Sequence, residues 1–169
     1  MKQLSEMSDD DIRGAVAARY GEVAGAPGGR FGFPVGRDFA VELGYPAGVL
    51  DAMPAGVSES FTGAGNPHEH VRPEPGVTLL DLGCGAGLDL CIYAGRVGGT
   101  GRVIGVDFSD QMISKARKNF ALLGITWASF VCSGVESISI ESGTVDVVTA
   151  NGILNLSPDK DAVLTEAAR

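Results

Sequence analysis

The stretch LLDLGCGAGLDL, residues 79–90, decides the fold of this protein. An apolar run in it ends at Asp81, and glycines then occupy alternate positions: Gly83, Gly85 and Gly87. Glycine allows a sharp backbone turn and lets a ligand approach the main chain more closely than any Cβ would permit. The stretch therefore predicts a strand that leads into a ligand-binding loop and then into a helix.

Strand and helix patterns alternate along the chain after residue 76. Strands are expected over residues 77–82, 101–107, 127–133 and 144–151. Helices are expected over residues 87–97 and 109–124, and again from about residue 158. This alternation predicts an α/β fold with a doubly wound, mostly parallel sheet and right-handed crossovers. In such a sheet, ligands bind beyond the carboxyl ends of the strands.

The first 76 residues differ from the rest because they combine one helix pattern with many glycines and prolines. A helix capped by Ser8 is expected to end near Ala24, and residues 37–53 predict two short helices followed by a loop. This segment is either a linker with a stray helix or a helical cap folded over a site. We favour the cap because of the segment's aromatic side chains: Phe31, Phe33, Phe39, Tyr45 and Phe61. The expected organisation is a cap over residues 1–76 and a ligand-binding domain over residues 77–169.

The overall composition and charge restrict the classes of binding partner and the cellular location that we expect. A chain of 169 residues that is 44% hydrophobic can bury a core, and its net charge of −8 argues against nucleic acid as a partner. No segment approaches the roughly 18 apolar residues of a membrane span, and the N-terminus lacks a signal-peptide core. The three cysteines, Cys84, Cys91 and Cys132, show neither metal-ligand spacing nor a disulfide framework. We therefore expect a cytoplasmic protein that binds no metal, no membrane and no nucleic acid.

The glycine spacing and one acidic residue indicate the kind of ligand. A dinucleotide fingerprint needs a third glycine where this chain has Leu88, which disfavours a nicotinamide dinucleotide. Asp107 ends the second predicted strand, 26 residues after Asp81. A carboxylate there can accept hydrogen bonds from both hydroxyls of a ribose. The pattern therefore predicts a nucleoside ligand without choosing a particular cofactor.

The motif DLGCGAG after a strand resembles the first motif of class I S-adenosylmethionine-dependent methyltransferases. Three further segments resemble the arsenite methyltransferase family of that class: LGYPAGVLDAMPAGVSESFTGAGNP (43–67), GRVIGVDFSDQMISKARKN (101–119) and TVDVVTANGILNLSPDK (144–160). The resemblance implies a Rossmann-like methyltransferase core. It also implies S-adenosylmethionine as the cofactor and a small molecule as the methyl acceptor, whose identity the sequence does not reveal.

The same resemblance implies a set of cofactor contacts. At the methionine end these are Asp81, Gly83, Cys84, Gly85 and, folded over it, Asn66. At the nucleoside they are Asp107 on the ribose and, around the adenine, Phe108, Met112, Gly134 and Val135. Asn151, which closes the fourth predicted strand, would face the methyl group.

Departures from the arsenite methyltransferase pattern bear on the substrate. The family binds arsenite through cysteine thiolates, soft ligands for a soft centre, but this chain has Ala64 and Gly152 at two of those positions. Cys84 and Cys132 follow strands that are not neighbours in the family's sheet, so they are not expected to replace the lost ligands. Gly134 also lacks the acid that commonly accepts from the adenine amine. We therefore expect a methyltransferase whose acceptor is a small molecule other than arsenite.

The sequence identifies no catalytic residue. Methyl transfer from a sulfonium depends chiefly on a near-attack geometry, so no acid or base is obligatory. His68 and His70, in the loop expected near the cofactor, are either proton acceptors or solvated loop residues. A cofactor-binding module without catalysis stays open as an alternative function.

The family's sheet has further strands for which this sequence shows no pattern. The strand expected over residues 144–151 would then be an apolar edge, which proteins normally cover. Three explanations are open: a truncated or fragmentary chain, a second copy that pairs along this edge in a homo-oligomer, or an N-terminal segment that covers the edge.

Overall fold

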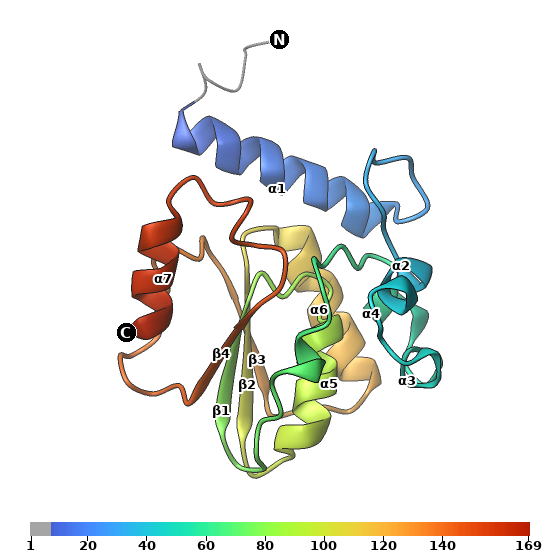
Figure 1. Ribbon diagram of the computed structural model, residues 1–169, viewed down its shortest axis with the longest axis vertical. Coiled ribbons are helices and arrows are strands. Elements are labelled where there is room, and N and C mark those ends of the chain that lie inside the picture. The colour runs from blue at the N-terminus through green and yellow to red at the C-terminus, as the bar shows by residue number, and fades with distance from the viewer. Residues whose placement is uncertain (1–7) are drawn as a thin grey trace.

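A computed structural model describes residues 8–169 and shows one parallel sheet with the strand order β3-β2-β1-β4 (Figure 1). The strands are β1 (Thr78–Leu82), β2 (Arg102–Asp107), β3 (Ala128–Cys132) and β4 (Val147–Ala150). The helices that accompany them are α5 (Leu88–Val97), α6 (Asp110–Leu122) and α7 (Lys160–Ala168). The predicted doubly wound parallel sheet is thus confirmed, and each strand lies within its expected range. Residues 1–7 of the expected cap lie outside the described residues.

Helices cover both faces of the sheet because alternate strand residues point to opposite sides. Leu79 and Val103 pack in the core formed with α5 and α6, whereas Leu80, Ile104 and Val106 pack in the core beneath α7. These side chains are at most 5% exposed. Burial on both faces explains why the strands read as nearly continuous apolar runs.

The glycine loop connects β1 to α5 through backbone conformations that favour glycine. Gly83, Gly85 and Gly87 have φ values of 73°, 52° and 93°. The N–H groups of Gly83 and Cys84 both donate to the carbonyl of Val106, at 2.8 and 2.9 Å, which ties the loop to the end of β2. The loop is therefore held by main-chain bonds and leaves its outer face free of side chains.

The N-terminal segment forms more helix than its sequence predicts. Helix α1 (Asp9–Gly25) begins as expected at Ser8, whose side chain accepts from the N–H of Asp11 while the Asp11 side chain accepts from that of Ser8. The two short helices expected over residues 37–53 are α2 (Arg37–Glu42) and α3 (Ala47–Asp51). The expected loop after them was wrong in part, since it contains α4 (Ala55–Ser58) and a 3-10 turn, η2 (Pro67–Glu69). Helices this short depend on tertiary packing, which a local pattern does not reveal.

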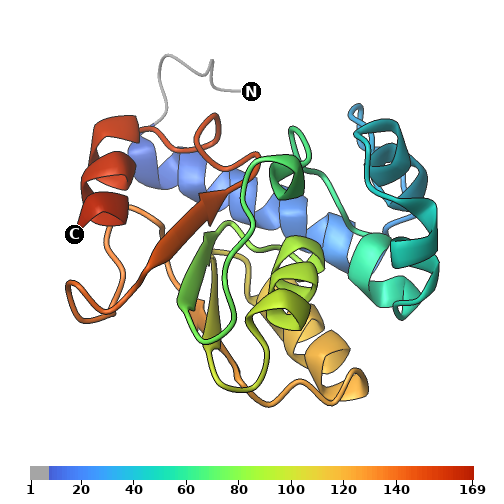
Figure 2. The same cartoon turned by 60° about the horizontal axis from the view of Figure 1, so that its bottom comes forward.

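The N-terminal helices pack against the sheet domain as a cap and not as a linker. Helix α1 crosses the end of the molecule where the strands lead into loops, and α2–α4 lie beside α5 and α6 (Figures 1 and 2). The Lys115 ammonium on α6 joins the two parts: it bonds the carbonyl of Ala24 at 3.1 Å and the hydroxyl of Ser60 at 2.7 Å. It also pairs with Glu59 at 2.6 Å. The exact division at residue 76 stays a prediction.

Strand β4 forms an edge of the sheet. Among the described residues it pairs with β1 alone, and α2–α4 lie on the opposite side of the molecule (Figure 2). Helices α2–α4 therefore do not cover this edge, and coverage by another part of the N-terminal segment stays a prediction. Pairing of a second copy along the edge stays a prediction.

No helix within residues 8–169 is both long and apolar enough to cross a bilayer.

Two glycines of the loop should tolerate substitution differently. At Gly83 an added Cβ would lie 2.8 Å from the Ile153 Cβ, whereas at Gly85 it would meet no atom within 4 Å. Both changes to alanine carry the left-handed backbone penalty of about 1–2 kcal/mol. Gly83→Ala adds a steric clash of roughly 1–3 kcal/mol. Urea denaturation should show the larger loss of unfolding free energy for Gly83→Ala, and equal losses would contradict this geometry.

Candidate functional site

Small adjoining cavities follow the carboxyl ends of the strands. One of about 30 Å³ is lined by residues that include Gly83, Gly85, Asp107, Phe108, Met112 and Asn151. A second, of about 40 Å³, is lined by residues that include Gly83, Cys84, Gly85, Asp89 and Asn151. A third, of about 20 Å³, is bordered by Phe108, Gly134 and Val135. The structure thus brings nine of the eleven expected site residues to one line of cavities, and places Asp81 and Asn66 elsewhere.

Asp107 lies where β2 ends, between the glycine loop and α6. One carboxylate oxygen accepts from the N–H of Gly85 at 2.9 Å, and the other from the N–H of Ser109 at 2.8 Å. Burial raises the pKa of Asp107 to about 6, although these N–H groups favour the charged form. Asp107 is therefore an oriented, ionised acceptor at neutral pH.

Asp81 lies behind the glycine loop and faces β4. Its carboxylate accepts from the Thr149 hydroxyl at 2.8 Å, and the residue is only 2% exposed. Burial raises the pKa of Asp81 well above its ordinary value, and the neighbouring charges of Asp89 and Asp107 raise it further. Three carboxyl groups therefore lie close together around the loop, and the raised pKa of Asp81 favours its neutral, protonated form. Direct contact between Asp81 and a cofactor stays a prediction.

Asp89, in the first turn of α5, is the main residue that the sequence analysis missed. Its Oδ1 accepts from the Tyr45 hydroxyl at 2.5 Å and bonds the Nε2 of His68 at 2.8 Å. Its Oδ2 accepts from the Asn151 amide at 2.9 Å. The sequence feature that could have identified Asp89 is its place near the start of the helix LDLCIYAGRV, where the neighbouring residues are apolar.

The two histidines have different environments. His68 is 7% exposed, and its Nδ1 lies 3.5 Å from the guanidinium of Arg96. Because arginine can only donate and the Asp89 carboxylate accepts, we assign His68 as neutral with its proton on Nε2. Both ring nitrogens are then engaged, which favours a positioning role over proton transfer. His70 is exposed, as expected of a solvated loop residue.

Two asparagines shape the segment above the glycine loop. The Asn151 Oδ1 accepts from the N–H groups of Ala64 and Gly65 at 2.8 and 3.2 Å, and its Nδ2 donates back to the Gly65 carbonyl at 3.0 Å. Asn66 caps the 3-10 turn by accepting from the N–H of His68 and donates to the carbonyl of Gly44. Asn151 therefore ties residues 64 and 65 to the end of β4, and the proposed cofactor contact of Asn66 stays a prediction.

A carboxylate that the sequence analysis did not assign stands near the position expected to border the adenine. A Cβ added at Gly134 would lie 2.8 Å from the Oε2 of Glu136. Glu136 also accepts from the Ser157 hydroxyl at 2.8 Å and pairs with Arg13 at 3.5 Å. The chain lacks an acid at position 134, but the carboxylate of Glu136, two residues further along the chain, lies beside that position.

Sulfur ligands do not converge at the site. Cys84 is buried against Gly105, and burial raises the pKa of its thiol well above the ordinary value. Cys132 is exposed at the end of β3, and β2 separates that strand from β1. Ala64 and Gly152 do lie together, since a Cβ at Gly152 would be 3.5 Å from the Ala64 nitrogen. The two positions are adjacent as the resemblance requires, but neither carries sulfur.

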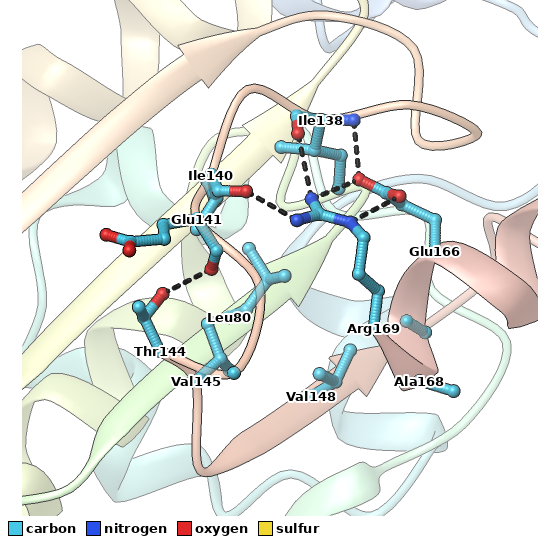
Figure 3. A pocket seen from close by; sticks show the side chains of 12 residues that line it. Leu80, Ile138, Ile140, Glu141, Thr144, Val145, Val148, Glu166, Ala168 and Arg169 are labelled. Carbon is cyan, nitrogen blue, oxygen red and sulfur yellow. Dashed lines mark hydrogen bonds and ion pairs between the residues drawn. The ribbon is translucent and has the colours of Figure 1, made fainter.

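A further cavity, of about 180 Å³, lies apart from this line, between the sheet and the end of α7 (Figure 3). The Arg169 guanidinium borders it, donating to the carbonyls of Ile138 and Ile140 at 3.0 and 2.6 Å and pairing with Glu166. Its lining includes Val145, which precedes β4, so the cavity lies toward the amino ends of the strands. It is therefore not part of the glycine-loop site.

Replacing Asp89 should destabilise the protein strongly. Asp89→Ala leaves the buried donors of Tyr45, His68 and Asn151 without their acceptor, at about 1–3 kcal/mol for each group that stays unpaired. Urea denaturation should therefore show a loss of roughly 3 kcal/mol or more. The control Asp38→Ala, whose carboxylate is 94% exposed, should change the unfolding free energy by less than about 0.5 kcal/mol. Similar effects of the two substitutions would show that the network does not hold the cap.

Comparison with known proteins places these features in a family. Residues 73–169 match the family described as Methyltransferase domain. An arsenite methyltransferase of Halobacterium salinarum is 38% identical over 127 residues, which are 75% of this chain and 32% of that protein. Nocamycin O-methyltransferase of Saccharothrix syringae is 38% identical over 99 residues, 59% of this chain and 35% of that protein. The chain spans about a third of the length of these curated relatives.

Solved structures agree with the sequence relatives. An arsenic(III) S-adenosylmethionine methyltransferase from Chlamydomonas reinhardtii is 33% identical with a TM-score of 0.65, covering 71% of this chain and 42% of that one. A SAM dependent methyltransferase from Aquifex aeolicus is 27% identical with a TM-score of 0.55, covering 57% and 51%. The chain therefore belongs to the methyltransferase-domain family, among the class I S-adenosylmethionine-dependent methyltransferases and close to the arsenite methyltransferases.

Proposed function

We propose that this chain binds S-adenosylmethionine at the glycine loop and transfers its methyl group to a small molecule other than arsenite. The observation that carries the proposal is the pair of buried carboxylates, Asp89 and Asp107, that line the cavities beside that loop. Such a pair favours a cationic ligand, and S-adenosylmethionine carries a sulfonium and an ammonium. Family membership supports the same cofactor.

The residues around the loop fit this cofactor. The main chain at Gly85 borders open space, because an added Cβ would meet no atom within 4 Å. Each Asp107 oxygen accepts a main-chain N–H, and because a carboxylate has about four lone-pair sites it can also accept from ribose hydroxyls. Phe108, Met112 and Val135 supply apolar surface for the adenine. The amino acid end would lie beside Asp89, whose carboxylate suits an ammonium.

The chain's contribution to the reaction is to position the reactants. When bound, the cofactor supplies a sulfonium methyl group that an acceptor lone pair takes, while the carbon–sulfur electron pair stays on sulfur and the acceptor's proton leaves to solvent. Asn151, which lines the two cavities at the loop, also holds the main chain of Ala64 and Gly65 in place beside them. Holding the two reactants in line supplies most of the rate enhancement in such displacements. No acid or base is assigned.

The relatives favour catalysis over a binding module that lacks chemistry, since those named above are methyltransferases. Their names differ in the acceptor, because one is an arsenite methyltransferase and another a nocamycin O-methyltransferase. Ala64 and Gly152 support an acceptor of the organic kind, because neither position carries a sulfur ligand.

Cofactor affinity should fall as the pH drops through about 6. Burial raises the pKa of Asp107 to about 6, and the ionised carboxylate is the form that accepts from both ribose hydroxyls. Calorimetry should show an affinity that weakens by up to about tenfold per pH unit below that pKa. In Asp107→Asn the affinity should be at least about fivefold lower at neutral pH and should lose this pH dependence. Equal affinities at neutral pH would refute the ribose placement.

The pH dependence of stability provides an independent check on Asp107. The contribution of Asp107 to stability should fall as the pH rises, whereas cofactor affinity should rise. The folded protein keeps this proton up to about pH 6, whereas the unfolded chain releases it near its ordinary pKa of 3.8. The contribution of Asp107 to the unfolding free energy therefore falls as the pH rises through this window. Asp107→Asn should remove that part of the pH dependence in urea denaturation.

Arsenite should not serve as a methyl acceptor. The thiol of Cys84 is buried with a raised pKa, and Ala64 and Gly152 provide no thiolate, so no pair of soft ligands is available to arsenic. Formation of the demethylated cofactor should be the same with and without arsenite. The Halobacterium salinarum arsenite methyltransferase serves as the positive control. Arsenite-dependent turnover by this chain would contradict the proposed acceptor class.

A further inference from the structure

The largest space near the glycine loop is a cavity of about 500 Å³ beneath α1. Its walls come from α1, the segment around Phe33 and Phe39, residues 62–64 and residues 152–156. This volume lies within the roughly 300–1,000 Å³ of small-molecule sites. It also explains why Val16 and Tyr20, on the apolar stripe of α1, are only partly buried.

One wall of this cavity is aromatic. The rings of Tyr20 and Phe33 stack at 6.2 Å between centroids with 22° between their planes, and Phe31 stacks on Phe33 at 5.9 Å. Phe39 also lines the space, while Phe33 is 37% exposed. Partly exposed stacked rings offer a face to which a further flat ring can add.

The cavity carries little net charge. Arg19 is the single charged side chain among its lining residues within the described chain. Its guanidinium donates to Glu22 at 2.8 Å and to the carbonyl of Phe31 at 2.6 Å, and it lies 5.8 Å from the Phe33 ring centroid. The charge of Arg19 is thus already balanced by Glu22 and shared with the rings. A ligand in this cavity needs no charge of its own.

The cavity adjoins the cofactor site. Tyr20, Thr62 and Gly152 line both this cavity and the small one that contains Gly85 and Asp107. Gly152, with φ of 84°, adds no side chain at this boundary, where Tyr20, Thr62 and Leu156 also lie. A molecule held in the cavity can therefore reach toward the methyl group of a cofactor bound at the loop.

Resting on the function proposed above, we propose that this cavity binds the methyl acceptor and that the acceptor is an uncharged, ring-bearing organic molecule. Its ring stacks against Tyr20 and Phe33. The hydroxyl of Thr62 and the amide of Asn155, which also line the cavity, orient the polar atom that receives the methyl group.

Fluorescence titration with 2-naphthol, an uncharged ring-bearing probe, tests this without the cofactor. Saturable binding is expected, at least about tenfold tighter than that of naphthalene-2-sulfonate, which has the same rings and a negative charge. Tighter binding of the sulfonate would overturn the uncharged class, because Arg19 would then be the anchor. Absence of saturable 2-naphthol binding would overturn the proposal as a whole.

Two substitutions on α1 locate the bound probe. Ala15 and Ala18 are both exposed, but only Ala15 lines the cavity. Ala15→Trp should weaken 2-naphthol binding at least about tenfold, and the matched control Ala18→Trp should change it less than about twofold. Phe33→Ala, at a ring that is 37% exposed and lies outside the sheet, should also weaken it. Unchanged binding in both Ala15→Trp and Phe33→Ala would overturn the location.

Calorimetry with S-adenosylmethionine on the same variants separates this proposal from the general one. Cofactor affinity should be unchanged in Ala15→Trp and Phe33→Ala, because neither residue lines the cavities at the glycine loop. Probe binding without cofactor binding would defeat the proposed function alone. Cofactor binding without probe binding would defeat the acceptor class alone.

Discussion

The Asp89 carboxylate joins three parts of the chain that are distant in sequence, and the site depends on this junction. It receives hydrogen bonds from Tyr45 of the cap, from His68 of the 3-10 turn and from Asn151 at the end of β4. A buried carboxylate is stable only while such partners remain in place. If the cap separated from the sheet, the Asp89 carboxylate would be exposed to solvent or would lose its hydrogen-bond donors. The part of the cap next to the glycine loop therefore belongs to the folded core.

The chemistry of the site follows from how the loop and the carboxylates share one end of the sheet. Main-chain N–H groups of the loop bond to the end of β2, and Gly85 bonds Asp107 directly. The carboxylates of Asp89 and Asp107 line the cavities at the point where Gly85 leaves the loop free of side chains. A nucleoside that carries a sulfonium meets both features, which is why a glycine loop alone is a weaker argument than the loop together with its acids.

The differences from the arsenite methyltransferases lie around the site and not in the strands, at Ala64 of the cap and at Gly134 and Gly152, which follow β3 and β4. The sheet, the loop and the position of Asp107 agree with the family. Positions 64 and 152 have small residues, and they line the same cavity as the stacked rings of Tyr20 and Phe33. A metalloid centre needs soft ligands, whereas stacked rings and a balanced charge suit an organic molecule. The same methyl-donor site can therefore serve a different acceptor when the cap changes.

The order of strands and helices, the glycine loop and Asp107 were predictable from the sequence. These features are local: the periods of apolar residues reveal the elements, and the position of an acid at a strand end places it at the edge where ligands bind. Asp89 with Tyr45 and His68, the stacking of Tyr20 on Phe33 and the nearness of Glu136 to position 134 were decided by tertiary structure. Their partners lie in separate segments or depend on a backbone bend, as with Tyr45 and Asp89, which are 44 residues apart. A local pattern carries no record of such contacts, because only packing of the cap onto the sheet determines which side chains meet.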